Sequence, residues 1–83
     1  MAQYNGIAAY IMASGRNRAI YTGCTSDLET RVAQHKLGVF EGFSKEKGCT
    51  QLVWYESFEE MAAAIRRERA IKHWSRAWKL GLI

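Results

Sequence analysis

Five polar side chains in this sequence are of the types that together could cleave a phosphodiester bond. They are two phenols, a guanidinium, an imidazole and a carboxylate, contributed by Tyr10, Tyr21, Arg31, His35 and Glu68. A guanidinium can bind a phosphate through two parallel hydrogen bonds. An imidazole, with an ordinary pKa of about 6.5, can accept a proton near neutrality, and a carboxylate can bind a divalent metal ion. We therefore treat these residues as candidate catalytic groups.

Glu68 is the candidate that is hardest to explain by a structural role. It follows Ile65 by three residues and Met61 by seven, so it falls on the apolar stripe of a predicted helix. A buried carboxylate without a partner destabilises a fold by several kcal/mol. The functional interpretation is an oxygen ligand for one Mg²⁺ or Mn²⁺ ion, with water and substrate phosphate in the other positions. The structural alternative is a salt bridge to Arg31 or to a neighbour on the same helix.

The general base is left open among three residues. Tyr10 and Tyr21 have ordinary pKa values of about 10, so either phenol needs a nearby cation to act as a base, whereas His35 does not. A strand tyrosine is often a core residue with its hydroxyl at the edge, and this interpretation competes more strongly for Tyr21 than for Tyr10. For Arg31 the structural alternative is a surface ion pair with Asp27, one helical turn earlier.

Basic charge is concentrated at the C-terminal end of the chain. The net charge is +4 overall, and the segment from Met61 onward has six Lys and Arg residues against one acid, Glu68, which gives +5. Such a segment could dock a polyanion, although Lys and Arg are also common on solvated helix faces. Trp74 and Trp78, one helical turn apart, are interpreted as core residues rather than base-stacking platforms. The candidate nucleic-acid contacts are Phe43, Ser44, Lys45, Lys47, Arg66, Arg67, Arg69, Lys72 and Arg76.

Two strands and a helix are predicted in the first half of the chain. Residues 7–13 and 18–24 are apolar, β-permissive runs separated by turn formers, which predicts an antiparallel hairpin. A capping box at Ser26-Asp27-Leu28-Glu29 predicts a helix over about 27–37, ended by Gly38. The buried stripe of this helix is predicted at Leu28, Val32 and Ala33, with Arg31 and His35 one turn apart on its flank.

The second half adds one strand and two helices. Residues 39–49 are predicted as a loop, 52–55 as a strand rich in β-branched and aromatic residues, and 59–73 and 75–82 as helices. The longer helix has an apolar stripe made of Met61, Ala62, Ile65, Ile71 and Trp74. The order β-β-α-β-α-α predicts one α+β domain over residues 1–83, a three-stranded antiparallel sheet flanked by helices.

Length and composition exclude several classes of protein. A chain of 83 residues with 48% hydrophobic residues can fold alone around one small core. No apolar run approaches the roughly 20 residues that span a bilayer, and the N-terminus lacks a signal sequence, so we expect a cytoplasmic protein without membrane association. Cys24 and Cys49 have no metal-ligand spacing and are expected to be reduced thiols. We also expect a monomer without a small-molecule cofactor.

The spacing of these residues resembles the GIY-YIG nuclease family. In that family a strand ends in Tyr, and Tyr-Ile-Gly follows after ten intervening residues. An Arg, then a His or Tyr four positions later, and a distant Glu complete the set. Here the two tripeptides read Ala8-Ala9-Tyr10 and Tyr21-Thr22-Gly23, and the family's Gly-Phe-Ser-Lys run appears at 42–45. The likeness is greatest to small single-domain members, which resemble the N-terminal nuclease module of the bacterial excision-repair incision subunit. The family's later Asn-Pro pair is not found before Ile83.

The resemblance implies a metal-dependent DNA endonuclease in which water attacks the phosphodiester in line. It implies catalytic roles for the five polar residues above and metal binding by Glu68. It also implies low sequence specificity and a connection to DNA repair or recombination. One alternative is a nucleic-acid-binding module that has lost catalysis. Another is a protein-interaction domain in which the polar cluster is only a buried network.

Overall fold

The computed structural model describes residues 6–15, 19–38 and 48–83. Their elements, in order, are β1 (Ala8–Ala13), β2 (Ile20–Thr25), α1 (Leu28–Leu37), β3 (Gln51–Ser57), α3 (Met61–Lys72) and α4 (Arg76–Leu80). The predicted order and the α+β class are confirmed. The candidate contacts Phe43, Ser44, Lys45 and Lys47, and most of the predicted 39–49 loop, lie outside the described residues.

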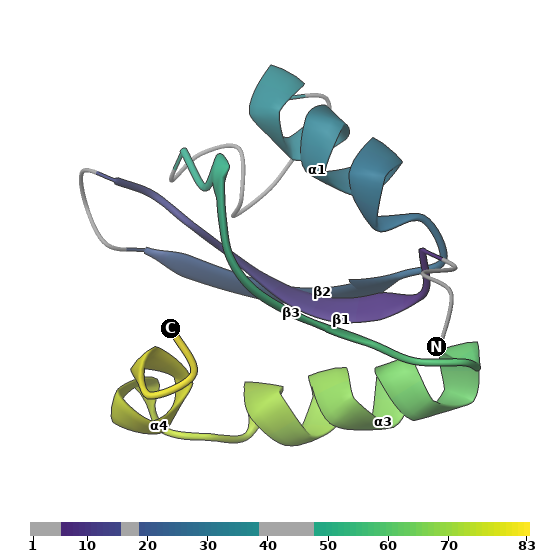
Figure 1. Ribbon diagram of the computed structural model, residues 1–83. Helices are drawn as coiled ribbons and strands as arrows, with labels where there is room; N and C mark the ends of the chain where they lie inside the picture. Colours follow the sequence, from purple (N-terminus) through teal and green to yellow (C-terminus); the bar gives the residue numbers. More distant parts are fainter. Residues whose placement is uncertain (1–5, 16–18, 39–47) are drawn as a thin grey trace.

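The described strands form an antiparallel sheet of order β2-β1-β3, with β1 in the centre (Figure 1). All six residues of β1 are buried, because this strand is covered on both faces and paired along both edges. Tyr10 lies opposite Gly23 of β2 on one side and Tyr55 of β3 on the other. Residues that lie opposite one another in a sheet share a face, so this register decides which side chains meet.

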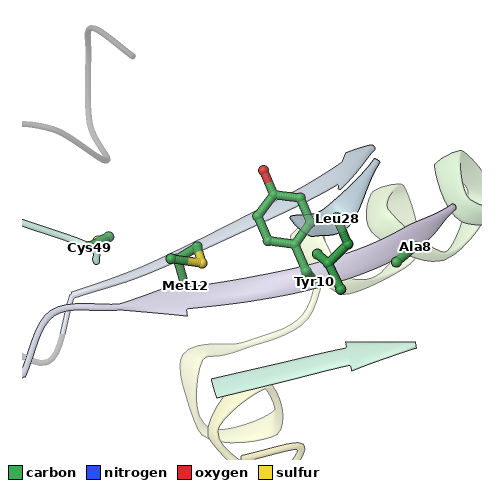
Figure 2. Packing of buried hydrophobic residues seen from close by; sticks show 5 residues of the cluster. All are labelled: Ala8, Tyr10, Met12, Leu28 and Cys49. Atoms are coloured by element: carbon green, nitrogen blue, oxygen red, sulfur yellow. The ribbon is translucent and has the colours of Figure 1, made fainter. Parts of the chain in front are cut away.

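Helices cover both faces of the sheet: α1 lies on one side, and α3 and α4 lie on the other (Figure 1). Alternate residues of β1 point to opposite faces. Ala8, Tyr10 and Met12 pack with Leu28 of α1 and with Cys49, forming the core cluster on the α1 face (Figure 2). The intervening residues of β1 point to the other face, which α3 covers with its buried residues Ala64 and Ile71.

The start of α1 differs from the predicted capping box. Asp27, and not Ser26, is the N-cap: its carboxylate accepts hydrogen bonds from the Thr30 backbone N–H, at 3.3 Å, and from the Thr30 hydroxyl, at 2.7 Å. The Thr25 hydroxyl accepts the Asp27 N–H at 3.0 Å, which places the first helical turn one residue later. The predicted end at Gly38 is confirmed, with φ of +68°, a left-handed conformation that glycine adopts without strain.

The buried stripe of α1 also differs from the prediction at one position. Leu28 is buried and Val32 is partly buried, but Ala33 is exposed and His35 is 5% exposed. Residues four and seven positions after Leu28 lie on its face of a helix, whereas the fifth is rotated away from it. His35 therefore belongs to the face that packs on the sheet.

The C-terminal helices correct the prediction for Trp78. Trp74 is partly buried, but Trp78 is 67% exposed. Its helix, α4, is separate from α3, with Ser75 as the N-cap whose hydroxyl oxygen accepts the Trp78 backbone N–H at 3.3 Å. A spacing of one turn therefore does not keep the two indoles on one continuous stripe. Ala62, predicted in the apolar stripe of α3, is also exposed.

Two further observations bear on the composition of the chain. Cys24 and Cys49 are not joined by a disulfide, as predicted, and the Cys49 thiol lies 3.7 Å from the Ala19 carbonyl oxygen. Within the described ranges, every helix is too short or too polar to cross a lipid bilayer.

Candidate active site

A buried hydrogen bond joins Tyr10 of β1 to His35 of α1. The Tyr10 hydroxyl lies 2.9 Å from His35 Nε2, and the two residues are 2% and 5% exposed. Gly23 makes this contact possible, because a Cβ atom there would lie 2.8 Å from both Cζ and Oη of Tyr10. The absence of a side chain at Gly23 thus lets the phenol extend across β2 toward α1.

The protonation state of each partner follows from its pKa. Burial, assisted by the charge of Arg31, lowers the pKa of His35 below its ordinary 6.5, so the imidazole is neutral at pH 7. Burial first, and then the neighbouring Tyr21, raise the pKa of Tyr10 well above 10, although Arg31 opposes them. The phenol therefore keeps its proton, and His35 is the more basic member of the pair. The tautomer of the neutral imidazole decides which of the two groups donates in this hydrogen bond.

Tyr21 completes an aromatic cluster with these two residues. Its ring centroid lies 5.3 Å from that of His35 and 6.4 Å from that of Tyr10. Tyr21 is partly buried and stands on β2, an edge strand, whereas Tyr10 is on the central strand. Tyr10 is the more fully buried of the two, although Tyr21 also packs against the core cluster, so the core interpretation fits Tyr10 more closely than the sequence led us to expect. Tyr21 is the member of the cluster that is open to solvent.

Glu68 is held by two hydrogen-bond donors on the α3 face of the sheet. Its Oε2 atom accepts the Cys24 thiol at 3.1 Å, and its Oε1 atom lies 2.5 Å from the Lys72 ammonium, one turn along α3. Burial raises the pKa of Glu68, but the hydrogen bonds from Lys72 and Cys24 outweigh it and leave this pKa below its ordinary value. Burial and the Glu68 contact raise the pKa of Cys24 to about 11, so its thiol is protonated and donates. Lys72 is thus the same-helix partner that the structural alternative required.

The two groups of residues meet at β2 because neighbouring residues of a strand point to opposite faces. Gly23 faces Tyr10 and α1, and the next residue, Cys24, faces Glu68 and α3. The charges of Arg31 and Glu68 both act on Tyr10, and Arg31 also acts on Cys24 and His35. Tyr10, Tyr21 and His35 thus lie together on the α1 face of the sheet, whereas Glu68 lies on the α3 face, next to the edge strand β2. The charge of Arg31 acts on both groups.

Cys24 and Lys72 are residues of this region whose part the sequence did not reveal. Lys72 stands four positions after Glu68, which is ion-pair spacing; the sequence predicts it as a nucleic-acid contact, and the same-helix alternative for Glu68 does not single it out. Cys24 had no signal apart from its place directly after Gly23. The ion pair between Arg31 and Asp27 offered as an alternative has a competitor, because the Asp27 carboxylate caps α1 through Thr30.

A divalent ion at this edge would have Glu68 as its protein ligand. Within the described ranges, no three His, Cys, Asp or Glu side chains converge as a metal site would require. A Mg²⁺ ion does not need such a set, because it usually keeps several waters and takes one or two carboxylates plus substrate phosphates. Glu68 fits this composition, provided that the Lys72 ammonium moves away from Oε1. The Lys72 side chain is 51% exposed and reaches solvent, so it has space to move.

Of the predicted basic contacts in the described ranges, Lys72 pairs with Glu68, and the four arginines fall into two groups. The Arg67 side chain donates from Nε to Glu56 at 3.1 Å, and its guanidinium lies over the rings of Trp54 and Trp74, at 5.8 and 5.2 Å. Arg67 therefore has a structural role, linking α3 to β3. The remaining predicted arginines are exposed on α3 and α4 and are called the outer arginines below: Arg66, Arg69 and Arg76.

Comparison with known proteins identifies the family. A model of the GIY-YIG catalytic domain matches residues 7–81. The chain belongs to the GIY-YIG family. This is a family of nucleases that generally depend on a metal ion.

The relatives of this GIY-YIG chain are small proteins of similar length. A UPF0213 protein of Staphylococcus haemolyticus is 37% identical over 68 residues, 82% of this chain and 83% of that protein. A UPF0213 protein of Vibrio parahaemolyticus is 37% identical over 76 residues, 92% of this chain and 71% of that one. The solution NMR structure of a UPF0213 protein from Bacillus halodurans superposes with a TM-score of 0.57 at 30% identity, covering 92% of this chain and 80% of that chain.

Proposed function

We propose that this protein is a metal-dependent endonuclease that hydrolyses phosphodiester bonds in DNA. The observation that carries the proposal is the buried Tyr10–His35 hydrogen bond, because it couples a phenol to a neutral imidazole beside Tyr21 and Arg31. A buried hydrogen-bond network that is only structural does not require a neutral imidazole able to accept a proton, whereas hydrolysis requires a base. Membership of a nuclease family supports the same conclusion.

In this proposal, each residue has a distinct part in the attack of water on phosphorus. Water loses a proton to the Tyr10 oxygen while the phenol proton passes to His35 Nε2, so no free phenolate has to form. The O–P bond forms as the bond to the leaving oxygen breaks in line with it. Arg31 binds the phosphate and stabilises the charge that develops there. Tyr21, at the open edge, orients the attacking water.

Glu68 would hold the metal ion in this scheme. A Mg²⁺ or Mn²⁺ ion, when bound, supplies a Lewis acid for the phosphoryl oxygens. The carboxylate is ionised without the metal because Lys72 and Cys24 hydrogen-bond to it. We assign Lys72 the role of neutralising Glu68 in the metal-free protein.

DNA is the proposed partner because the C-terminal segment carries +5 and presents the outer arginines to solvent. A domain of this size has little surface with which to read bases, so cleavage is proposed to have low sequence specificity. A monomeric, cytoplasmic nuclease acting in DNA repair or recombination is the biological setting we propose.

Nicking of supercoiled plasmid tests this function directly. The wild-type protein should nick the plasmid with Mg²⁺ or Mn²⁺ and stop when chelator is added. Tyr10→Phe removes the hydroxyl of the buried hydrogen bond and should reduce nicking at least a hundredfold, the usual scale of acid–base catalysis. Tyr55→Phe is the matched control, because it removes a phenol from the neighbouring strand and should leave nicking unchanged. Nicking that persists in chelator, or equally in Tyr10→Phe, would overturn the proposal.

A nucleic-acid-binding module without catalysis is the second candidate. The observation in its favour is that protein donors already occupy both oxygens of Glu68. The two candidates differ in one respect that is simple to measure: both predict DNA binding by the basic helix, but only the first predicts product. Binding without any nicking in Mg²⁺ or Mn²⁺ would favour the second.

A further inference from the structure

Trp78 is a large aromatic residue that the fold leaves accessible. It is 67% exposed on α4, although tryptophan is usually well buried. Its indole is nonetheless not an isolated surface side chain, because it packs edge-on against Trp74, with ring centroids 5.8 Å apart and an interplanar angle of 79°. The ring therefore has one supported side and much of its surface open to a ligand.

A chain of contacts fixes this support to the sheet. Trp74 is covered by the Arg67 guanidinium, which also lies over Trp54 of β3 and is held by Glu56. Arg67, Trp54 and Trp74 are therefore held in fixed positions behind the exposed ring of Trp78. Pre-ordering of this kind lowers the entropic cost of binding a ligand on Trp78.

The charge around Trp78 distinguishes between possible ligands. Arg76 and Lys79 flank it on α4, and the whole segment from Met61 carries +5. A second copy of this chain would bring two such segments together, which electrostatic repulsion disfavours. A nucleic acid instead supplies both an aromatic base for the indole and phosphates for the cations.

We infer that Trp78 is a stacking platform for an unpaired base, and that the substrate of this protein is a nucleic acid with a single-stranded segment. In an intact duplex the base faces are stacked on each other, so only an unpaired or displaced base can lie on the indole. Trp78 stands on α4, the helix that follows α3, and α3 carries Glu68. The inference rests on the proposed function for its substrate, but the binding event needs no cleavage.

Equilibrium binding of labelled DNA in chelator tests the platform. The probes are a short oligo-dT strand and a blunt hairpin duplex with the same number of phosphates, titrated at several salt concentrations. Trp78→Ala should weaken binding of oligo-dT by about 5- to 150-fold, the effect of losing one stacked base. The slope of affinity against salt should not change, because no phosphate contact is lost. Duplex binding should stay within about twofold.

Three control variants make the result specific. Trp78→Phe keeps an aromatic face and should retain most of the oligo-dT affinity, whereas Trp78→Leu keeps only apolar area and should not. Tyr55→Ala removes an exposed aromatic residue from the α1 face of the sheet and should have no effect. Because Trp78 is largely exposed, its variants should fold, and circular dichroism checks this.

Distinct outcomes would overturn the inference. One is an unchanged oligo-dT affinity in Trp78→Ala, and another is an equal loss for the duplex, which would indicate a general contact. Sedimentation that shows a wild-type dimer, converted to a monomer by Trp78→Ala, would instead assign the indole to self-association. If the protein does not nick plasmid but binds oligo-dT in a Trp78-dependent way, the nuclease proposal is rejected and the stacking role of Trp78 is retained. If the protein nicks plasmid but Trp78→Ala leaves oligo-dT binding unchanged, the stacking role is rejected and the nuclease proposal is retained.

Discussion

Replacement of Gly23 by alanine should disturb the centre of the candidate active site without adding any polar group. The new Cβ would lie 2.8 Å from Cζ and Oη of Tyr10 and 3.1 Å from Cε1. Ordinary contacts between carbon atoms are about 3.5–4.0 Å, so the phenol has to move by about 0.7 Å. It has little freedom to do so, because Tyr10 is 2% exposed and stands on the central strand.

The expected cost follows from this overlap. Overpacking of a core by one methyl group costs about 1–3 kcal/mol, which in a domain of this size lowers the melting temperature by about 5–20 °C. The shift is also large enough to misalign the 2.9 Å hydrogen bond from Tyr10 to His35, so nicking should fall more steeply than stability. Thermal unfolding by circular dichroism and plasmid nicking per folded molecule measure the two effects.

Gly15→Ala is the matched control for Gly23→Ala. A Cβ at Gly15 would approach only the end of the flexible Gln51 side chain, at 3.2 Å, so this variant should change stability by less than about 0.5 kcal/mol. Replacing Tyr10 with the shorter leucine should relieve the clash with a Cβ at position 23. The double variant Tyr10→Leu, Gly23→Ala should therefore lose less stability than the sum of the losses in the two single variants. A Gly23→Ala protein as stable as wild type, or strict additivity with Tyr10→Leu, would refute the explanation of the glycine.

Other predictions concern buried polar groups and the basic helix. Thr22 has a buried hydroxyl with no hydrogen-bond partner among the described residues, so Thr22→Val should stabilise the protein by about 1 kcal/mol in urea unfolding. Thr25→Val is the control: it removes the hydrogen bond to Asp27 and should destabilise the protein by about as much. Burial lowers the folded-state pKa of His35, so its contribution to the free energy of unfolding should be fully present above pH 6.5 and should be lost as the pH falls through that lowered pKa. His35→Gln should flatten this pH dependence of stability. An unchanged dependence in His35→Gln would contradict the lowered pKa of the buried imidazole. Reversal of the outer arginines to Glu should weaken DNA binding and flatten its salt dependence by roughly one unit of slope per lost phosphate contact, whereas Lys36→Glu on α1 should not.

The order of elements could be predicted from the sequence because it depends on local patterns. The hairpin register follows from a short turn, and it alone places Gly23 opposite Tyr10. Helix periodicity likewise placed Glu68 on an inward-facing stripe, where it is 13% exposed.

The features that could not be predicted depend on contacts between distant segments. Tyr10 is the buried phenol because β3 pairs with β1 and makes it the central strand, which leaves Tyr21 on an edge. The partner of Glu68 on β2, Cys24, is 44 residues away in sequence. The predicted division into two C-terminal helices is confirmed, but the one-turn spacing of Trp74 and Trp78 does not show which side of α4 packs on the fold, so the exposure of Trp78 could not be predicted.

The most direct test of the central claim, that the polar residues along the β2 edge form a nuclease active site, is the nicking rate of Glu68→Gln per folded molecule. The amide has one acceptor oxygen where the carboxylate has two, so it keeps only one of the bonds from Cys24 and Lys72. Lys72 is half exposed and can turn to solvent, so stability should change by only about 1 kcal/mol. Glu56→Gln, which alters the carboxylate paired with Arg67 on β3, is the control and should nick normally. The account predicts that Glu68→Gln binds DNA as wild type does and nicks it slower by several orders of magnitude, since metal binding supplies several kcal/mol of transition-state stabilisation. Normal nicking by folded Glu68→Gln would contradict it.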